Sequence, residues 1–269
     1  MGTMNAEITS CWHDEGAARE LLGHRCWPDG IVCLRCGNEV AGLADGRWRC
    51  RSCRYTFGLF TGRWLARSGF SARKWLCLTD LFAREYPLRK ISSRLNVAYN
   101  TAYKGVSIIR QALSAAPPCP LDPSFLTARP VEATRPPVFG IQISPGGYHC
   151  VPVPDLPVQS MWEMGLACSR CGNVVITSAF QQYTHLVFCA TPALCRMCEH
   201  RLEDIPVYNW GSSPFWDFVC PRLARFHGIT PERFPLYLKE MEWRWNTGIV
   251  QRFFDRALAA LCRRVKGPR

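Results

Sequence analysis

Two cysteine pairs early in the sequence have the spacing of a metal site. Cys33 and Cys36 lie in VCLRCGN, Cys50 and Cys53 lie in WRCRSCR, and thirteen residues separate the two pairs. Two short hairpins can each present a pair of thiolates to one tetrahedral ion, and this spacing is typical of a zinc ribbon. Four thiolates close the coordination shell of zinc. We therefore predict a structural ion that performs no catalysis.

A second cysteine set lies in the other half of the chain. Cys168 and Cys171 are in CSRCGN, Cys195 and Cys198 are in CRMCEH, and twenty-three residues lie between the pairs. Two segments in this gap, VVITSAF and THLVFCA, are plausible strands. We predict a second zinc ribbon at about residues 165–201 and a second structural zinc, with Cys189 or His200 as substitute ligands. The alternative is a cluster of buried free cysteines.

Carboxylates are missing from long stretches of the second half. Residues 133–154 and 164–198 contain no Asp or Glu, and the sequence has no phosphate-loop motif and no Ser-His-Asp or Cys-His pattern. The acids nearest to these stretches are Glu203, Asp204, Asp217, Glu240 and Glu242. We expect their side chains to be solvated or ion-paired, with Arg244 as one partner. The alternative is that these acids form a catalytic site, relocated from the stretches that lack carboxylates.

Three helical segments follow the first ribbon and would position its chemistry. Trp75, Leu78, Phe82 and Tyr86 recur at helical spacing in SARKWLCLTDLFAREY, and LRKISSRLNV and AYNTAYKGVSIIRQALSA supply two further helices. Three short helices predict a helix-turn-helix, which reads DNA with the front of its last helix. The predicted internal positions are Ile91, Leu95, Ala102 and Ile109, and the predicted DNA-contacting positions are Arg73, Lys74, Tyr99, Asn100, Thr101, Tyr103, Lys104 and Arg110. The alternative is an ordinary helical hairpin with a solvated basic face.

Positive charge is concentrated in the first half of the chain. Residues 1–115 hold 17 Lys and Arg against 9 Asp and Glu, a net +8, whereas the remainder contributes only +4 of the total +12. Such an imbalance indicates a polyanionic partner, and we expect the ribbon to present basic residues to phosphates. The residues are Arg47, Arg49, Arg51 and Arg54. A helix-turn-helix favours the major groove of double-stranded DNA over the deep groove of RNA.

Composition and the positions of prolines define the predicted organisation. No apolar run reaches the length of a membrane span, and the first residues lack the pattern of a signal peptide. Grouped CxxC pairs favour metal binding over disulfides. We therefore expect a cytoplasmic protein. Seven prolines between Pro117 and Pro137 indicate a linker. Beyond it, VFGIQISPGGYHCVPV predicts two strands around a turn, and the stretch from Val250 to Leu261 has the periodicity of an amphipathic helix.

These motifs together carry a family resemblance. RCWPDGIVCLRCGN, WRCRSCRYTFGLFTGRW, RKWL and ISSRLNVAYNTAYKGVSIIRQAL, in this order, resemble the zinc-ribbon and helix-turn-helix front end of bacterial insertion-sequence transposases of the ISXO-like group. PFWDFVCPRLARFHGITPERFPLYLKEMEWRWN resembles the closing helices of the nuclease domain of that family. The resemblance implies a ribonuclease H-like domain in which three carboxylates hold two divalent metals for DNA cleavage and strand transfer.

The same resemblance implies that the nuclease site is lost. Gln142 stands at the position of the first aspartate, and Ser213 stands where the last glutamate is expected. We therefore predict an α+β multidomain protein with these parts: zinc ribbon 1–60, helix-turn-helix 61–115, linker 116–137, and a degenerate RNase H-like domain 138–269 that contains the second ribbon.

The hypothesis is a domesticated, nucleoid-associated protein of bacteria that binds duplex DNA, holds two zinc ions and does not cleave. The rival is an active transposase that uses Mg²⁺ or Mn²⁺ with relocated or partner-supplied acids. A third interpretation, compatible with the first, makes the aromatic-rich C-terminal domain a docking site for a protein partner; a homo-oligomer is also left open.

Overall fold

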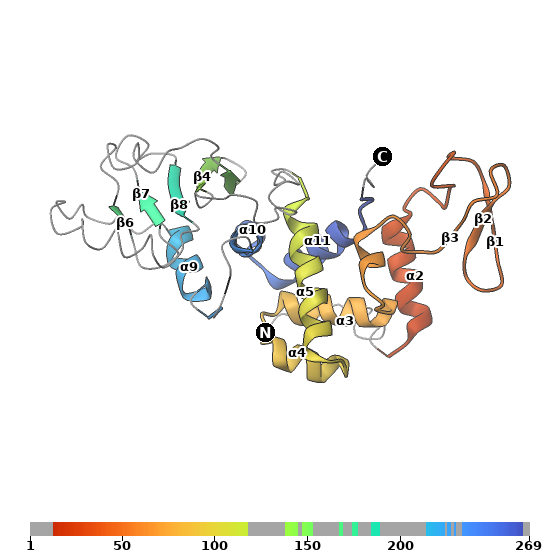
Figure 1. Cartoon of the computed structure of the whole chain (residues 1–269), viewed down its shortest axis with the longest axis horizontal. Helices are drawn as coiled ribbons and strands as arrows, with labels where there is room; N and C mark the ends of the chain where they lie inside the picture. Colours follow the sequence, from red (N-terminus) through yellow and green to blue (C-terminus); the bar gives the residue numbers. More distant parts are fainter. Residues whose placement is uncertain are drawn as a thin grey trace, which may run out of the picture. The chain divides into compact units, whose positions relative to one another are not determined.

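The computed structural model describes residues 13–117, 138–144, 147–152, 167–168, 174–176, 184–188, 214–223, 225–226, 229 and 233–265. The chain divides into two compact units (Figure 1). The first unit combines Met1–Leu113 with Ile249–Arg269, and the second is Ser114–Gly248. Residues 249–269, which the sequence predicted to lie in the C-terminal domain, group with the first unit.

A helix that the sequence analysis did not predict opens the first unit. Helix α2 (Glu15–Cys26) begins at Asp14, whose carboxylate accepts a 2.7 Å hydrogen bond from the Gly16 N–H. Ala18, Leu22 and Cys26 form its buried side. Because Glu15 accepts hydrogen bonds from the backbone N–H groups of Ala72 and Arg73 at 2.8 and 3.1 Å, it also satisfies the first turn of α3 (Ala72–Ala83).

A small antiparallel sheet follows α2. Its strands are β1 (Val40–Gly42), β2 (Trp48–Cys50) and β3 (Thr56–Phe57), in the order β1-β2-β3. In register, Val40 lies opposite Cys50 and Trp48 lies opposite Phe57. Such short strands bury little apolar surface; the buried Phe57 ring packs against the rings of Trp27 and Trp48, with centres 5.8 and 6.1 Å away. The sheet therefore depends on the cysteines at its end for its stability.

Three helices form the centre of the first unit, after a short 3-10 turn, η1 (Trp64–Arg67). They are α3, α4 (Leu88–Leu95) and α5 (Tyr99–Ser114). The four positions predicted to be internal, Ile91, Leu95, Ala102 and Ile109, are at most 6% exposed, which confirms that prediction. Asn96 ends α4 in the left-handed conformation, so the chain turns within three residues to start α5.

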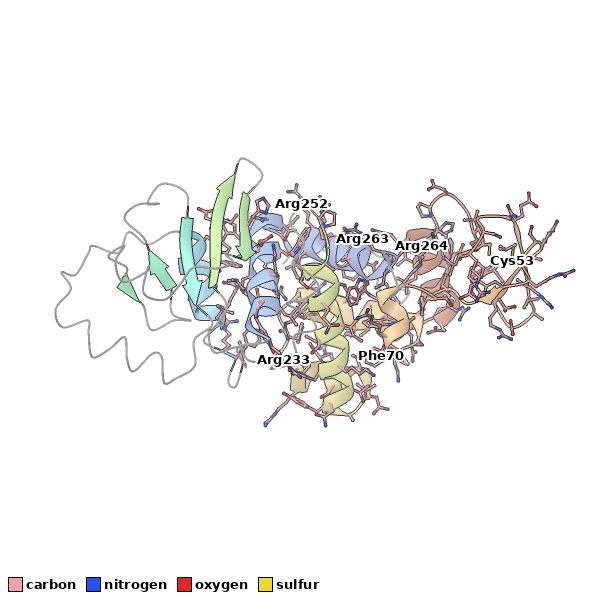
Figure 2. The ribbon with its side chains drawn as sticks, turned by 45° about the horizontal axis from the view of Figure 1, so that its top comes forward. Cys53, Phe70, Arg233, Arg252, Arg263 and Arg264 are labelled. Carbon is pink, nitrogen blue, oxygen red and sulfur yellow. The ribbon has the colours of Figure 1, made fainter. Side chains whose placement is uncertain are left out.

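The last helix, α11 (Val250–Cys262), completes this core. It packs on α2, α3 and η1, and the Phe253 and Phe82 rings lie 5.8 Å apart. The predicted amphipathic stripe is confirmed, because Phe253, Phe254, Ala257, Leu258 and Leu261 are buried; Val250, at the first turn, is exposed. Arg263 and Arg264 follow this helix (Figure 2), and the Val265 N–H donates to the Gly62 carbonyl at 2.8 Å.

The second unit contains a five-stranded sheet in the order β5-β4-β8-β7-β6. Its strands are β4 (Val138–Ser144), β5 (Gly147–Pro152), β6 (Ala167–Cys168), β7 (Val174–Ile176) and β8 (Thr184–Phe188). All described pairings are antiparallel. The hairpin of β4 and β5 and the strands expected in VVITSAF and THLVFCA are confirmed.

Two helices pack beside this sheet, α9 (Pro214–Leu223) and α10 (Phe234–Thr247). Phe215, Val219, Leu238 and Met241 form the centre of their core together with Cys150 from β5. The Asn246 amide clips α10 to β5, accepting from the Tyr148 N–H at 2.9 Å and donating to its carbonyl at 2.7 Å. None of the helices in the described part of the chain has the length and apolar character that crossing a membrane requires.

Candidate zinc centre and basic surface

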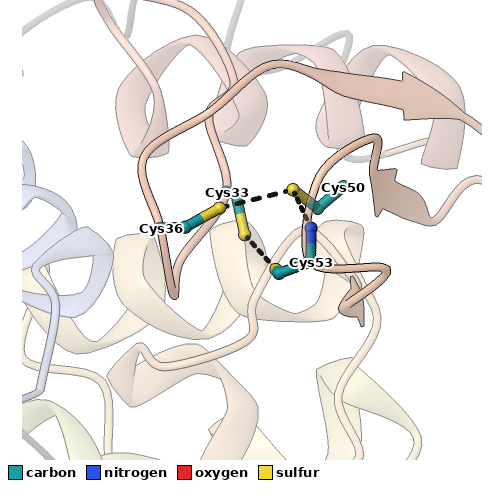
Figure 3. Close-up of side chains that lie close together, drawn as sticks. All are labelled: Cys33, Cys36, Cys50 and Cys53. Atoms are coloured by element: carbon teal, nitrogen blue, oxygen red, sulfur yellow. Dashed lines mark hydrogen bonds between the residues drawn. The ribbon is translucent and has the colours of Figure 1, made fainter.

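The four cysteines of the first ribbon converge on one point (Figure 3). The Sγ atoms of Cys33, Cys36, Cys50 and Cys53 all lie within 4.8 Å of one another. The Sγ atoms of Cys33 and Cys53 are 3.5 Å apart, as are those of Cys36 and Cys50. Tetrahedral zinc with bonds of about 2.3 Å to sulfur separates its ligands by roughly 3.8 Å. The donor set and its spacing therefore fit one zinc ion.

Backbone geometry holds each cysteine pair in a tight knuckle. In the first knuckle, the Gly37 N–H bonds the Cys33 carbonyl at 3.0 Å, and Gly37 takes a φ of 75°. Arg54 occupies the equivalent position of the second knuckle with a φ of 59°. That left-handed conformation suits glycine and is strained for arginine. The two knuckles are thus nearly equivalent, although only one has the glycine that eases its turn.

The electrostatics of the cluster favour a divalent cation. Burial opposes ionisation of Cys33, but hydrogen bonds from the backbone of Cys36 and Arg35 and from the Cys53 side chain outweigh it, lowering the Cys33 pKa to about 6. At Cys53 the backbone of Tyr55 favours the thiolate, but burial and the other three thiols raise the pKa to about 12. Four thiolates at this spacing repel one another, so a metal ion must compensate their charge.

The arginines predicted in the ribbon differ in what they contact. Arg47 pairs with Asp45 at 2.6 Å, and Arg51 lies 3.8 Å from Glu39, whereas Arg49 and Arg54 are exposed and make no ion pair in the described part of the chain. The sequence analysis missed Arg35, whose guanidinium lies 4.3 Å from the centre of the Tyr55 ring. Arg35 is inside the first knuckle, a position that could have indicated it.

The front of α5 presents most of the predicted helical contacts. Tyr99 is 51% exposed, and Asn100, Thr101 and Lys104 are exposed, whereas Tyr103 is half-buried. On α3, Arg73 is exposed and Lys74 is half-buried.

Arg110 does not belong to this surface. It is 5% exposed, and its guanidinium lies 5.6 Å from the centre of the Phe82 ring. Helical periodicity explains the error. A residue nine positions after Thr101 has rotated by two and a half turns and faces the core.

Helix α4 adds basic residues that the sequence analysis did not single out. Arg89, Lys90 and Arg94 are exposed, and none of them pairs with a carboxylate among the described residues. Lys90 and Arg94 lie over the ring of Tyr86, at 4.6 and 5.2 Å from its centre. The basic pattern of LRKISSR was the available signal. Arg89, Lys90, Arg94, Tyr99, Asn100, Thr101 and Lys104 are called the α4–α5 surface below.

Several predicted site residues lie outside the described residues or at the edge of them. Cys171, Cys195, Cys198 and Ser213 are outside, and Cys168 is placed only as the last residue of β6. The second zinc therefore stays a prediction. Gln142 lies at the centre of β4, opposite His149 on β5 and Thr184 on β8.

Of the five acids considered for a relocated active site, Glu203 and Asp204 lie outside the described residues, and only the backbone of Asp217 is described. The other two, Glu240 and Glu242 on α10, are engaged by other side chains. Glu240 pairs with Arg244 at 2.8 Å, the partner that the sequence suggested. Glu242 pairs with Lys239 at 2.7 Å, accepts from the Cys150 N–H at 2.6 Å, and lies 3.5 Å from Nδ1 of His149. Both carboxylates are 2% exposed. They stabilise the packing of α10 and have little freedom to bind a metal.

Comparison with known proteins identifies the family. Residues 13–56 match the transposase zinc-ribbon domain. An uncharacterized transposase-like protein of Haemophilus influenzae is 44% identical over 104 residues, which make up 38% of this chain and 84% of that protein. The chain belongs to this family of transposase-like zinc-ribbon proteins. The resemblance to insertion-sequence transposases is thereby confirmed; the ISXO-like group and domestication stay predictions.

A second relative covers less of its own length. An uncharacterized protein in transposable element ISH50 of Halobacterium salinarum is 29% identical over 111 residues, 39% of this transposase-like chain and 37% of the relative. The chain thus spans little more than a third of that protein. No solved structure matches the chain.

Proposed function

We propose that this transposase-like protein binds double-stranded DNA through its N-terminal unit and has lost the carboxylates needed for cleavage. In this proposal the ribbon holds a structural zinc and offers Arg49 and Arg54 to phosphates. Helices α3 to α5 act as a helix-turn-helix, in which α5 enters the major groove. The second unit is a degenerate RNase H-like domain, joined by a linker at 116–137 and containing a second zinc ribbon at about 165–201.

The α4–α5 surface carries the proposal. Its cationic side chains stand at the short turn between two helices and are not neutralised by carboxylates among the described residues. The cations of such a surface repel one another in the free protein. On binding, DNA phosphates relieve this repulsion, and the cations release counterions that were condensed on the DNA. Beside the cations, Asn100 and Thr101 offer groups that can read base edges, and Tyr99 offers an aromatic face.

The loss of cleavage rests on charge. An amide such as Gln142 is a neutral group and a weak anchor for a divalent metal. Glu240 and Glu242, two of the acids considered for a relocated site, form ion pairs within α10, and Glu242 also accepts a hydrogen bond from the Cys150 N–H of β5. We infer that the family chemistry, DNA cleavage and strand transfer, has no complete metal site here.

The test measures binding and cleavage on the same labelled duplex DNA. Zinc-loaded, full-length protein is mixed with the duplex, with and without Mg²⁺ or Mn²⁺, over a range of salt concentrations. We expect retardation without cleavage. Metal-dependent cleavage would overturn the loss of the nuclease site, and affinity that does not change with salt would overturn the electrostatic interface.

A matched pair of variants locates the interface. Replacing Lys90 and Lys104 by Gln removes two charges from the α4–α5 surface and should lower the slope of log affinity against log salt by about 1.8, or about 0.9 for each phosphate that the protein no longer neutralises. Replacing Arg252 and Arg256 by Gln removes the same charge from the exposed side of α11. Equal effects of the two double variants would show that only net charge matters.

A further inference from the structure

Two buried thiols meet where the first and last helices of the N-terminal unit end. Cys26 is the final residue of α2 and Cys262 is the final residue of α11, so 236 positions separate them in sequence. They are 5% and 4% exposed. Each thiol acts on the pKa of the other, so the two side chains lie close together. Neither residue belongs to the zinc site.

One guanidinium fastens both helix ends. Nη1 of Arg63 donates to the Cys262 carbonyl, and Nη2 donates to the Cys26 carbonyl. These carbonyls are among those that a helix leaves unsatisfied at its C-terminus, where the helix dipole also favours a cation. Arg63 therefore caps α2 and α11 at the same time and holds their last residues side by side.

The charge of Arg63 is buried without a carboxylate. Arg63 is 6% exposed, its Nε has no hydrogen-bond partner, and no acid pairs with it in the described part of the chain. Trp27 lies against one face of the guanidinium, 4.5 Å from it. Burial lowers the pKa of Arg63 and Arg264 adds to this effect, whereas ionisation of Cys26 or Cys262 would raise it, so a thiolate here can serve as the counter-ion of the buried cation.

The pair can meet this requirement by sharing one proton. The hydrogen bond from Cys262, the largest effect, and the charge of Arg63 together outweigh burial and lower the pKa of Cys26. The same hydrogen bond and burial raise the pKa of Cys262. These directions make Cys26 the thiol that ionises first and Cys262 the one that keeps its proton. A thiolate beside a second thiol is the combination that reacts with disulfides.

We propose that Cys26 and Cys262 are a redox pair, which a disulfide oxidant such as glutathione disulfide converts into a bond between the ends of α2 and α11. The Cys26 thiolate attacks one sulfur of the oxidant, forms a mixed disulfide and releases one glutathione thiolate. Cys262 then loses its proton to solvent and attacks the Cys26 sulfur, which releases the second glutathione thiolate. The protein loses two electrons and two hydrogens, and the oxidant is reduced to two thiols.

The consequence concerns how the unit is closed. Helix α11 reaches α2 and α3 only after the chain has passed through the whole second unit. In the dithiol state, packing, the Arg25–Asp255 ion pair at 2.9 Å and the Arg63 cap hold it there. In the disulfide state the same contact is covalent. Oxidation would thus fix the closing helix on the unit that carries the ribbon and the α4–α5 surface.

The experiment uses full-length, zinc-loaded protein titrated with glutathione disulfide. Remaining thiols are blocked with N-ethylmaleimide, the protein is digested with trypsin, and released zinc is measured. We expect a link between the peptides 26–35 and 257–263, two hydrogens lighter than their sum, before zinc is released. Since Cys33 shares the first peptide, fragmentation must place the link on Cys26. We also expect the oxidised protein to unfold several degrees higher than the reduced protein.

Matched variants separate this proposal from general thiol oxidation. Cys26→Ser should abolish the link, and Cys77→Ser, which removes a half-buried thiol of α3, should leave it unchanged. A link that maps to Cys33, a link that survives Cys26→Ser, or zinc release before any link forms would overturn the proposal. If Cys26→Ser does not fold, the fragmentation of the wild-type peptide decides the question by itself.

Discussion

Gly105 lies on the buried side of α5, the proposed recognition helix. A Cβ atom at this position would lie 2.5 Å from Cε2 of Phe70 and 2.6 Å from Cδ2 of Leu78. Both neighbours are buried, and the Phe70 ring is fixed edge-on against Trp75, with their centres 5.3 Å apart. Each contact is about 1 Å too short for carbon atoms. Gly105→Ala must therefore move α5 or disturb the packing of Phe70.

Two opposing effects set the change in the free energy of unfolding that Gly105→Ala causes. Overpacking of a core costs roughly 1–3 kcal/mol, and two clashes against fixed neighbours justify the upper end. Alanine gains about 1 kcal/mol over glycine inside a helix. The net expectation is a loss of about 2 kcal/mol, which lowers the unfolding midpoint of a unit of this size by roughly 6 °C. Calorimetry of the full-length, zinc-loaded protein measures this shift.

Gly69→Ala is the matched control. It lies one residue before Phe70, its Cβ would meet nothing within 4 Å, and its backbone is not left-handed. It should raise the midpoint slightly, by the equivalent of about 0.4–1 kcal/mol, because alanine restricts the unfolded chain. If Gly105→Ala behaves like Gly69→Ala, the core beneath α5 yields easily, and the close packing that fixes this helix is refuted.

Three further predictions concern the ribbon and the core. Cys33→Ser should release zinc and unfold the ribbon, which is measured as loss of bound metal and of protease resistance in residues 28–58. The control Cys77→Ser should keep both the metal and the resistance. A Cys33→Ser protein that keeps its zinc and its protease resistance would contradict the structural role. Arg54→Gly should relieve the strained φ of 59° and raise the affinity for zinc about twofold. The same substitution removes a cation that the proposed function places against a phosphate, so the salt slope of DNA binding should fall by about 0.9. Burial raises the pKa of Asp80 against the opposing effect of Arg84, so its contribution to stability is present below the ordinary pKa and is lost as pH rises through the folded pKa. Asp80→Asn lacks this loss, so its midpoint relative to wild type should increase as the pH rises above the ordinary carboxyl pKa of about 4; a constant difference would rule out a titrating Asp80.

Local patterns in the sequence predicted local features well. The CxxC spacing predicted the cluster of four thiols, because ligand geometry fixes the length of each knuckle. Periodicity predicted α3, α4, α5 and α11 and their buried sides, because one apolar stripe per helix is visible within a few turns of sequence. Arg110 shows the limit of this approach: a charge was taken as a surface signal at a position whose helical phase makes it internal.

Contacts between distant segments could not be predicted in the same way. The α2 helix has a weak apolar stripe, and its role becomes clear only when Glu15 reaches the start of α3 and Arg63 joins its end to α11. Nothing in the local sequence of Arg63 indicates that it satisfies two helix ends, since one of them comes from residues 199 positions later. The same holds for α11, whose amphipathic stripe fits any core of suitable shape.

The charges of α10 bear on whether the second unit keeps any nuclease chemistry. Lys239, Glu240, Glu242 and Arg244 are all buried, and they are arranged as two ion pairs along one helix. A carboxylate that binds a catalytic metal must exchange its partner for that ion, and here the exchange would leave Lys239 or Arg244 buried and uncompensated, at a cost of about 3–5 kcal/mol. A catalytic metal centre instead needs carboxylates that carry no such cation. Because Glu242 also accepts the Cys150 N–H, withdrawing it would further leave a backbone donor of β5 unsatisfied. Glu242 therefore ties α10 to β5 and Glu240 pairs within α10, so neither acid is free to serve as a ligand of a relocated catalytic metal.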